Sequence, residues 1–188
     1  MRELPAGSTD GPGTPLGRAE KGERMTTGDL AGTEQQTAPR ADLSTRTLWS
    51  GILFGVGLVA FLDEAVFHQL LHWHHFYDRG TPALGLVSDG VFHAFSWLAT
   101  IGGLFLLADL RRRGPLRWTR WWGGVLLGAG AFQLYDGTIQ HKLLGIHEIR
   151  YVPDLIVYDV IWNVVAVALV VAGIVLTVRT RRAPASAG

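Results

Sequence analysis

Four long apolar runs dominate the pattern of hydrophobic and polar positions along the chain. They cover residues 48–73, 86–110, 121–144 and 155–178, and short polar stretches separate them. Each run reaches the roughly 20 residues that a helix needs to cross a hydrocarbon core of about 30 Å. A buried helix of a soluble protein explains one such run but not four in succession. The pattern therefore predicts an all-α membrane protein, a bundle of four transmembrane helices.

The basic residues predict how these four helices are oriented. Most of them flank the first run, fill the stretch between the second and third runs, or follow the fourth: Arg40, Arg46, Arg111, Arg112, Arg113, Arg117, Arg120, Arg179, Arg181 and Arg182. The other two stretches hold only Arg79, Lys142 and Arg150. Because cytoplasmic loops carry the excess of Lys and Arg, we expect both termini in the cytoplasm.

The two ends of the chain differ from its middle. Residues 1–45 are rich in Gly, Pro, Thr, Ala and charge without an apolar period, so we predict a disordered N-terminal tail, within which Met25 is a second candidate start. After this tail we predict a transmembrane domain over residues 46–180 and a disordered C-terminal tail over residues 181–188. Composition agrees, since 48% of the residues are apolar and only 18% are charged. The absence of cysteine excludes disulfides and thiolate metal ligands.

An internal repeat relates the two halves of the predicted transmembrane domain. Residues 51–74 match residues 124–147 at a constant offset of 73, with nine of 24 positions identical. The identical positions include three glycines in each run, and the first two of each have G-x-x-x-G spacing, which predicts close helix packing. We therefore predict a duplication of two helical hairpins, about 48–110 and about 121–178, related by a pseudo-two-fold axis along the membrane normal.

Polar residues inside the apolar runs are the candidate functional site. Residues 63–75 read DEAVFHQLLHWHH, and carboxylates and histidines recur at a similar depth in the other runs. A charge at the centre of a membrane helix costs roughly 2.5–3.5 kcal/mol, so these side chains are expected to face one another, water or a bound cation. The candidate metal ligands are His68, His72, Asp89, His93, Asp136 and His141, with Asp63 and Glu64 as further candidates. The repeat pairs Asp63 with Asp136 and His68 with His141.

Helix geometry limits which of these side chains can meet. Asp63 and His68 are five residues apart, or 140° on a straight α-helix, where they face different neighbours; a π-bulge is one way to bring them together. The residues His74 and His147 are expected at the outer surface as a rim of the site. They join a polar network with Asp159 and Asn163, which correspond in the fourth run to Asp89 and His93 of the second.

Three interpretations of this cluster stay open at this point. The first is a site for a divalent transition metal, Zn²⁺, Fe, Mn or Cu(II), which suit imidazole and carboxylate ligands. The second is a non-catalytic assembly or structural protein whose polar network only holds the helices together. The third is a bundle that binds haem or conducts protons. Neither a catalytic residue nor a reaction follows from the pattern. The expected partners are the lipid bilayer, a membrane protein or a second copy bound through the glycine strips, and no nucleic acid.

The chain also resembles a known family at FHQLLHWHH, SDGVFHAFSW and YDGTIQHKLLGIHEIR. These segments are similar to those of a bacterial family of predicted integral membrane proteins, domain of unknown function 2243, over about residues 48–178. The family pattern has glycine and glutamine where this chain has Glu64 and His72, so the resemblance supports these two less as shared site residues. The resemblance implies a bacterial cytoplasmic membrane location and no established activity.

Overall fold

The computed structural model describes residues 27–182, and the side chains of residues 42–182. The chain divides into two compact units, residues 1–36 and 37–188, and the contacts below lie within the second. All regular elements of the described residues are helical: α1 (Thr27–Asp63), η1 (Glu64–Leu70), α2 (Pro82–Arg113), α3 (Trp118–Tyr135), η2 (Asp136–Leu144) and α4 (Leu155–Arg182). The predicted all-α class is confirmed for these residues. The parts of both predicted tails at residues 1–26 and 183–188 lie outside them.

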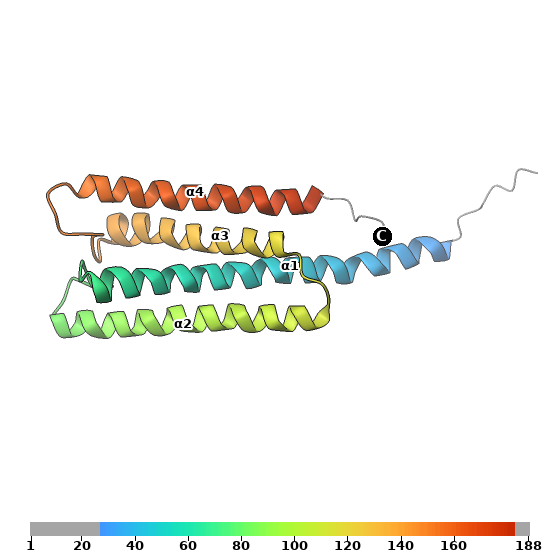
Figure 1. Cartoon of the computed structure of the whole chain (residues 1–188), viewed down its shortest axis with the longest axis horizontal. Coiled ribbons are helices and arrows are strands. Elements are labelled where there is room, and N and C mark those ends of the chain that lie inside the picture. The colour runs from blue at the N-terminus through green and yellow to red at the C-terminus, as the bar shows by residue number, and fades with distance from the viewer. Residues whose placement is uncertain (1–26, 183–188) are drawn as a thin grey trace, which may run out of the picture. The chain divides into compact units, whose positions relative to one another are not determined.

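Three of the described helices are long and apolar enough to cross a membrane. These segments are Asp42–Leu70, Pro82–Arg113 and Leu155–Thr180. The helix α3 is not among them, because glycine, tryptophan and Arg120 lower the mean hydropathy of its 18 residues. Figure 1 nevertheless shows α3 lengthwise beside the other helices, with α1 and α3 between α2 and α4.

Glycines allow the backbones of α1 and α3 to lie against each other. A Cβ atom on Gly55 would collide with the main chain of Val125, and one on Gly128 would collide with the main chain of Ile52. These two contacts are equivalent under the repeat, since Val125 and Gly128 lie 73 residues after Ile52 and Gly55. The close packing expected from the G-x-x-x-G spacing is therefore present between α1 and α3.

Each of these central helices also packs tightly on its own partner. Gly57 of α1 lies against the backbone at Thr100 of α2, and Gly130 of α3 lies against the backbone at Val170 of α4. Farther along the first pair, Ser50 Oγ donates a hydrogen bond to the carbonyl of Gly103 at 2.9 Å. The pairs α1–α2 and α3–α4 are thus two closely packed hairpins.

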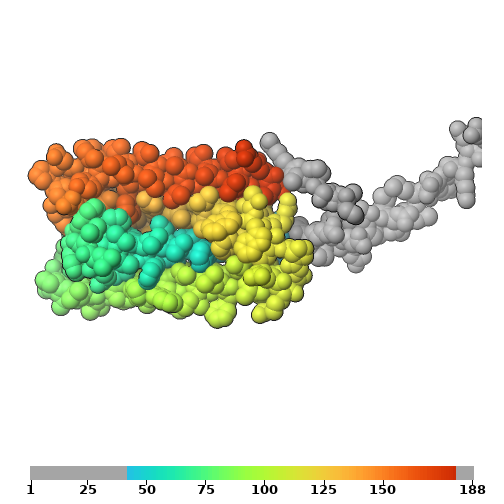
Figure 2. Space-filling view, in the orientation of Figure 1, coloured from blue at the N-terminus to red at the C-terminus, as the bar shows by residue number. Residues whose placement is uncertain are grey.

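The helices α2 and α4 expose apolar side chains along their outer faces. Leu98 and Phe105 on α2 and Ile156 and Val164 on α4 are all more than 60% exposed. In the space-filling view, α2 and α4 occupy opposite long edges of the face shown (Figure 2). Continuous apolar surface of this kind is rare in water and is the normal lipid-facing surface of a membrane helix.

Both central helices end in a π-helix and a tight reversal. The amide of Trp73 donates to the carbonyl of Phe67 after η1, and the amide of Ile146 donates to the carbonyl of Gln140 after η2. The residue before each amide has positive φ, 49° at His72 and 55° at Gly145. The two turns lie 73 residues apart in the sequence, and each directs the chain back over the end of the π-helix that precedes it.

Candidate metal centre

The two π-helices align carboxylates and histidines that an α-helix would keep apart. A π-helix places residue i+5 one turn above residue i. Accordingly, His68 Nε2 lies 3.7 Å from Asp63 Oδ2, and His141 Nε2 lies 3.0 Å from Asp136 Oδ2. The π-bulge considered from the sequence is present as a whole π-helical segment in both places.

The reversal after each π-helix adds a second histidine to each pair. His74 joins Asp63 and His68, and the ligand atoms of the three residues lie within 4.8 Å of one another. We call these residues the first triad. All three are buried, and His68 Nε2, His74 Nε2 and Asp63 Oδ1 have no hydrogen-bond partner among the described residues.

The second triad consists of Asp136, His141 and His147, which are also buried and within 4.8 Å of one another. His141 Nε2 lies 3.0 Å from His147 Nε2, and His147 Nε2 lies 3.5 Å from Asp136 Oδ1. Two ligand atoms bonded to one ion at about 2.0–2.2 Å stand roughly 3–3.5 Å apart. These separations therefore suit a single cation between the three side chains.

Two matched hydrogen bonds set the tautomers of the loop histidines. His74 Nδ1 donates to the carbonyl of Ile149 at 3.0 Å, and His147 Nδ1 donates to the carbonyl of Phe76 at 2.9 Å. The bonds are exchanged between the halves, because each histidine uses the loop of the other half. With the proton on Nδ1, each neutral ring presents the lone pair of Nε2 to its triad. Metal-binding histidines are normally oriented by this kind of bond.

Burial keeps the imidazole of His74 neutral. It lowers the pKa of His74 to about 2, and the neighbouring His68, His147 and His141 lower it further. The lone pair of Nε2 is therefore free for a cation at any physiological pH.

Stacked imidazoles connect the two triads. The rings of His74 and His147 are 4.6 Å apart between centroids and only 5° from parallel. Each of them also contacts the other histidine of its triad, at 4.5 Å for His68 and 4.6 Å for His141. The triads therefore form one continuous cluster at the π-helical end of the molecule.

Two further carboxylates contact only the first triad. His68 Nδ1 lies 2.9 Å from Glu64 Oε2 and 3.1 Å from Asp89 Oδ1. Asp89 is held in place by the amide of Phe76 at 2.7 Å and by His75 Nδ1 at 2.6 Å. Because a carboxylate accepts, the neutral ring of His68 carries its proton on Nδ1 and directs a lone pair on Nε2 toward Asp63.

Negative charge in the cluster has no balancing Lys or Arg among the described residues. Four carboxylates are at most 4% exposed: Asp63, Glu64, Asp89 and Asp136. Their partners are histidines, one backbone amide and the amide group of Gln69. Buried charges are normally paired or bound to metal, so this arrangement favours a bound cation.

The structure shows which of the residues predicted from the sequence lie close together. It brings together Asp63, Glu64, His68, Asp89, Asp136 and His141, and it adds His74 and His147. These two were expected at an outer rim and are instead buried in the centre, because the reversals after the π-helices fold them inward. His75 was not a candidate ligand, and its Nδ1 lies 2.6 Å from Asp89 Oδ2.

Other candidates lie outside the two triads and outside a third group of close ligand atoms, formed by Glu64, His68 and Asp89. His72 is exposed in its positive-φ turn, and His93 is half-buried with its ring 5.7 Å from that of Phe61. Asp159 pairs with Lys142 at 2.8 Å, and Asn163 donates to the carbonyl of Asp159. The carbonyls of Phe76 and Ile149 were not foreseen, although the offset of 73 relates them.

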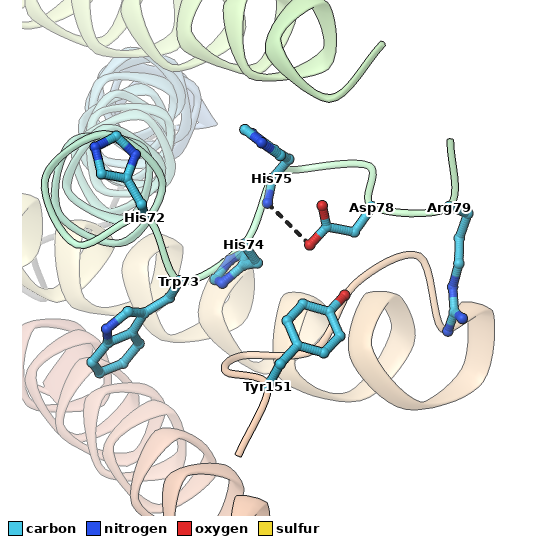
Figure 3. Close-up of a pocket in the computed structure, with 7 residues that line it drawn as sticks. All are labelled: His72, Trp73, His74, His75, Asp78, Arg79 and Tyr151. Carbon is cyan, nitrogen blue, oxygen red and sulfur yellow. Dashed lines mark hydrogen bonds between the residues drawn. The ribbon is translucent and has the colours of Figure 1, made fainter. Parts of the chain in front are cut away.

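A pocket of about 450 Å³ adjoins the first triad. Its lining includes His74 together with Trp73, Asp78, Arg79 and Tyr151. Figure 3 shows the loop that carries His74 and His75 running between His72 and Asp78, with Tyr151 opposite Asp78 and a hydrogen bond of 3.2 Å from the His75 amide to Asp78. A buried ligand of the first triad is thus also a wall of a cavity large enough for a small molecule.

Comparison with known proteins places this chain in a family. No curated protein and no solved structure matches it. A family model matches residues 50–180, which include α2, α3, both π-helices, all but the last two residues of α4 and every residue of the two triads. That match covers well over half of the chain and confirms the resemblance seen in its motifs. The chain belongs to the family described as predicted membrane protein, DUF2243.

Proposed function

We propose that this membrane protein binds a divalent transition metal through the first and second triads. The observation that carries the proposal is the convergence of buried acceptors in the first triad. The lone pairs of His68 Nε2 and His74 Nε2 meet the carboxylate of Asp63 with no hydrogen-bond donor between them. Three acceptors in contact repel one another, and a cation relieves the repulsion.

The donor chemistry narrows the class of metal. Each triad offers two imidazoles and one carboxylate and leaves coordination positions open. Such sets hold non-haem iron or catalytic zinc, and they also accept Mn²⁺ and Cu(II). An ion with open positions beside a pocket can polarise a water or a substrate carbonyl. Metal-assisted hydrolysis and the handling of metal for another membrane protein both fit this arrangement.

The proposed topology places the site near the outer face of a bacterial cytoplasmic membrane. The lengths of the apolar runs support four spans, with α3 and η2 together as the third, and the arginine distribution supports both termini inside. The contacts repeated at an offset of 73 support an origin by duplication of one helical hairpin. The glycines are used within the chain, so they do not favour a second copy as the partner.

Elemental analysis of the purified protein tests the metal proposal. Protein isolated in detergent without chelator is expected to carry stoichiometric metal, and His68→Ala is expected to contain clearly less. His93→Ala is the matched control, since this histidine lies in the same membrane domain but outside the triads. Absence of metal from the wild type, or equal loss from both variants, would contradict the proposal.

A second candidate function is a structural polar network. It is favoured by one observation, that the ring nitrogens of His68 lie 2.9–3.7 Å from Glu64, Asp89 and Asp63. A positively charged imidazolium would satisfy these carboxylates without metal. In that case the wild type carries no metal, and His68→Ala lowers the unfolding temperature sharply, as expected when one partner of a buried charge network is removed.

A further inference from the structure

The two triads do not share a ligand. Each contributes one carboxylate and two histidines, and the ligand atoms lie within 4.8 Å of one another inside each triad but do not form one group of six. Opposite ligands of a six-coordinate ion stand about 4.2 Å apart, twice a bond of roughly 2.1 Å. A single ion therefore cannot bind all six side chains. On this ground, and resting on the metal binding proposed above, we infer that the site holds two divalent ions in one coupled centre, one in each triad.

Charge balance supports two ions. The four buried carboxylates of the cluster carry four negative charges when ionised, and no Lys or Arg among the described residues pairs with them. Two divalent ions balance this charge, whereas one ion leaves half of it uncompensated in a buried environment.

The hydrogen bonds of the loops couple the two positions. His74 is oriented by the carbonyl of Ile149 from the second half, and His147 is oriented by the carbonyl of Phe76 from the first half. The two rings stack directly on each other. An ion bound in one triad therefore fixes a loop that also positions a ligand of the other triad.

The two ions are expected to be held unequally. In the first triad, His68 Nδ1 faces the carboxylates of Glu64 and Asp89. In the second, Gly137 stands at the position of Glu64 with Trp162 packed against it, and His141 Nδ1 has no hydrogen-bond partner among the described residues. Carboxylate partners raise the basicity of a ligating histidine, and their loss typically costs 10–100-fold in metal affinity. The first triad is thus the tighter site.

Titration with Co²⁺ after removal of endogenous metal tests this inference. The full chain in detergent is expected to bind about two Co²⁺ per chain in two phases. The electron paramagnetic resonance signal per ion is expected to be weakened by the magnetic coupling between the two ions. His74→Asn and His147→Asn each remove one Nε2 ligand but keep a side-chain N–H for the loop carbonyl. Each variant is expected to bind about one Co²⁺ without coupling, and His74→Asn is expected to lose the tighter phase.

The outcomes separate the inference from the proposed function. If the wild type saturates at one Co²⁺ per chain, the two-ion centre is wrong while metal binding stands. If the wild type binds no Co²⁺ and contained no metal when isolated, both fail. The count on the wild type needs no substitution, so the inference is tested even if a variant does not fold.

Discussion

At the scale of single residues, His72 and Gly145 form the turns that fold His74 and His147 back into the two triads. They occupy equivalent turns, and both have positive φ, which costs an ordinary side chain energy that glycine does not pay. The sequence pattern made His72 a candidate ligand because it lies four residues after His68. The structure assigns it to the turn, with its side chain exposed at the pocket.

We therefore expect His72→Gly to stabilise the protein. Replacing a residue of positive φ by glycine removes backbone strain of roughly 1 kcal/mol, partly offset by the greater entropy of the unfolded chain. The thermal midpoint in detergent should rise slightly, and the metal content should equal that of the wild type. Loss of metal in this variant would show that His72 is a ligand after all.

At the scale of elements, the decisive features are the two π-helices and the glycine contact that aligns them. Two residues five positions apart lie on the same side of a π-helix, whereas they point in different directions on an α-helix. The contact of α1 with α3 then sets the two π-helices at the same level, so that the stacked rings of His74 and His147 meet. Metal binding is thus expected to depend on residues far from any ligand.

Gly128→Ala tests this dependence. The new Cβ would overlap the main chain of Ile52, and backbone cannot move aside as a side chain can. We expect a loss of stability of about 1–3 kcal/mol, as for other overpacked interiors, together with weaker metal binding. Gly90→Ala is the matched control, because a Cβ there meets nothing within 4 Å and alanine favours the helix. Equal unfolding temperatures for the two variants would contradict the role of the α1–α3 contact.

At the scale of the whole molecule, both triads lie at the end of the four helices opposite the arginine-rich stretch at residues 111–120 and the end of α4. Charge asymmetry of this kind sets the orientation of membrane proteins. The proposed orientation therefore exposes the pocket beside His74 to the outside, where a metal ion reaches it without crossing the membrane.

Cysteine labelling checks that orientation, because the chain has no cysteine of its own. Pro153→Cys lies in the loop before α4 on the site side, and Pro115→Cys lies in the loop between α2 and α3. A membrane-impermeant maleimide applied to intact cells is expected to label the first variant and not the second. After lysis both should react. The reverse pattern would place the metal centre on the cytoplasmic side.

The sequence by itself determined the helical class, the membrane character and the identity of most residues in the cluster. These follow from local quantities, the length of apolar runs and the energetic cost of charge within them, and an offset of 73 already paired Asp63 with Asp136 and His68 with His141. Only the tertiary structure decided which of these residues meet. The change from α- to π-helix, the reversal that buries His74 and the exchanged bonds to loop carbonyls depend on packing between the two halves. No local pattern encodes them, because each half supplies the partners that the other half needs.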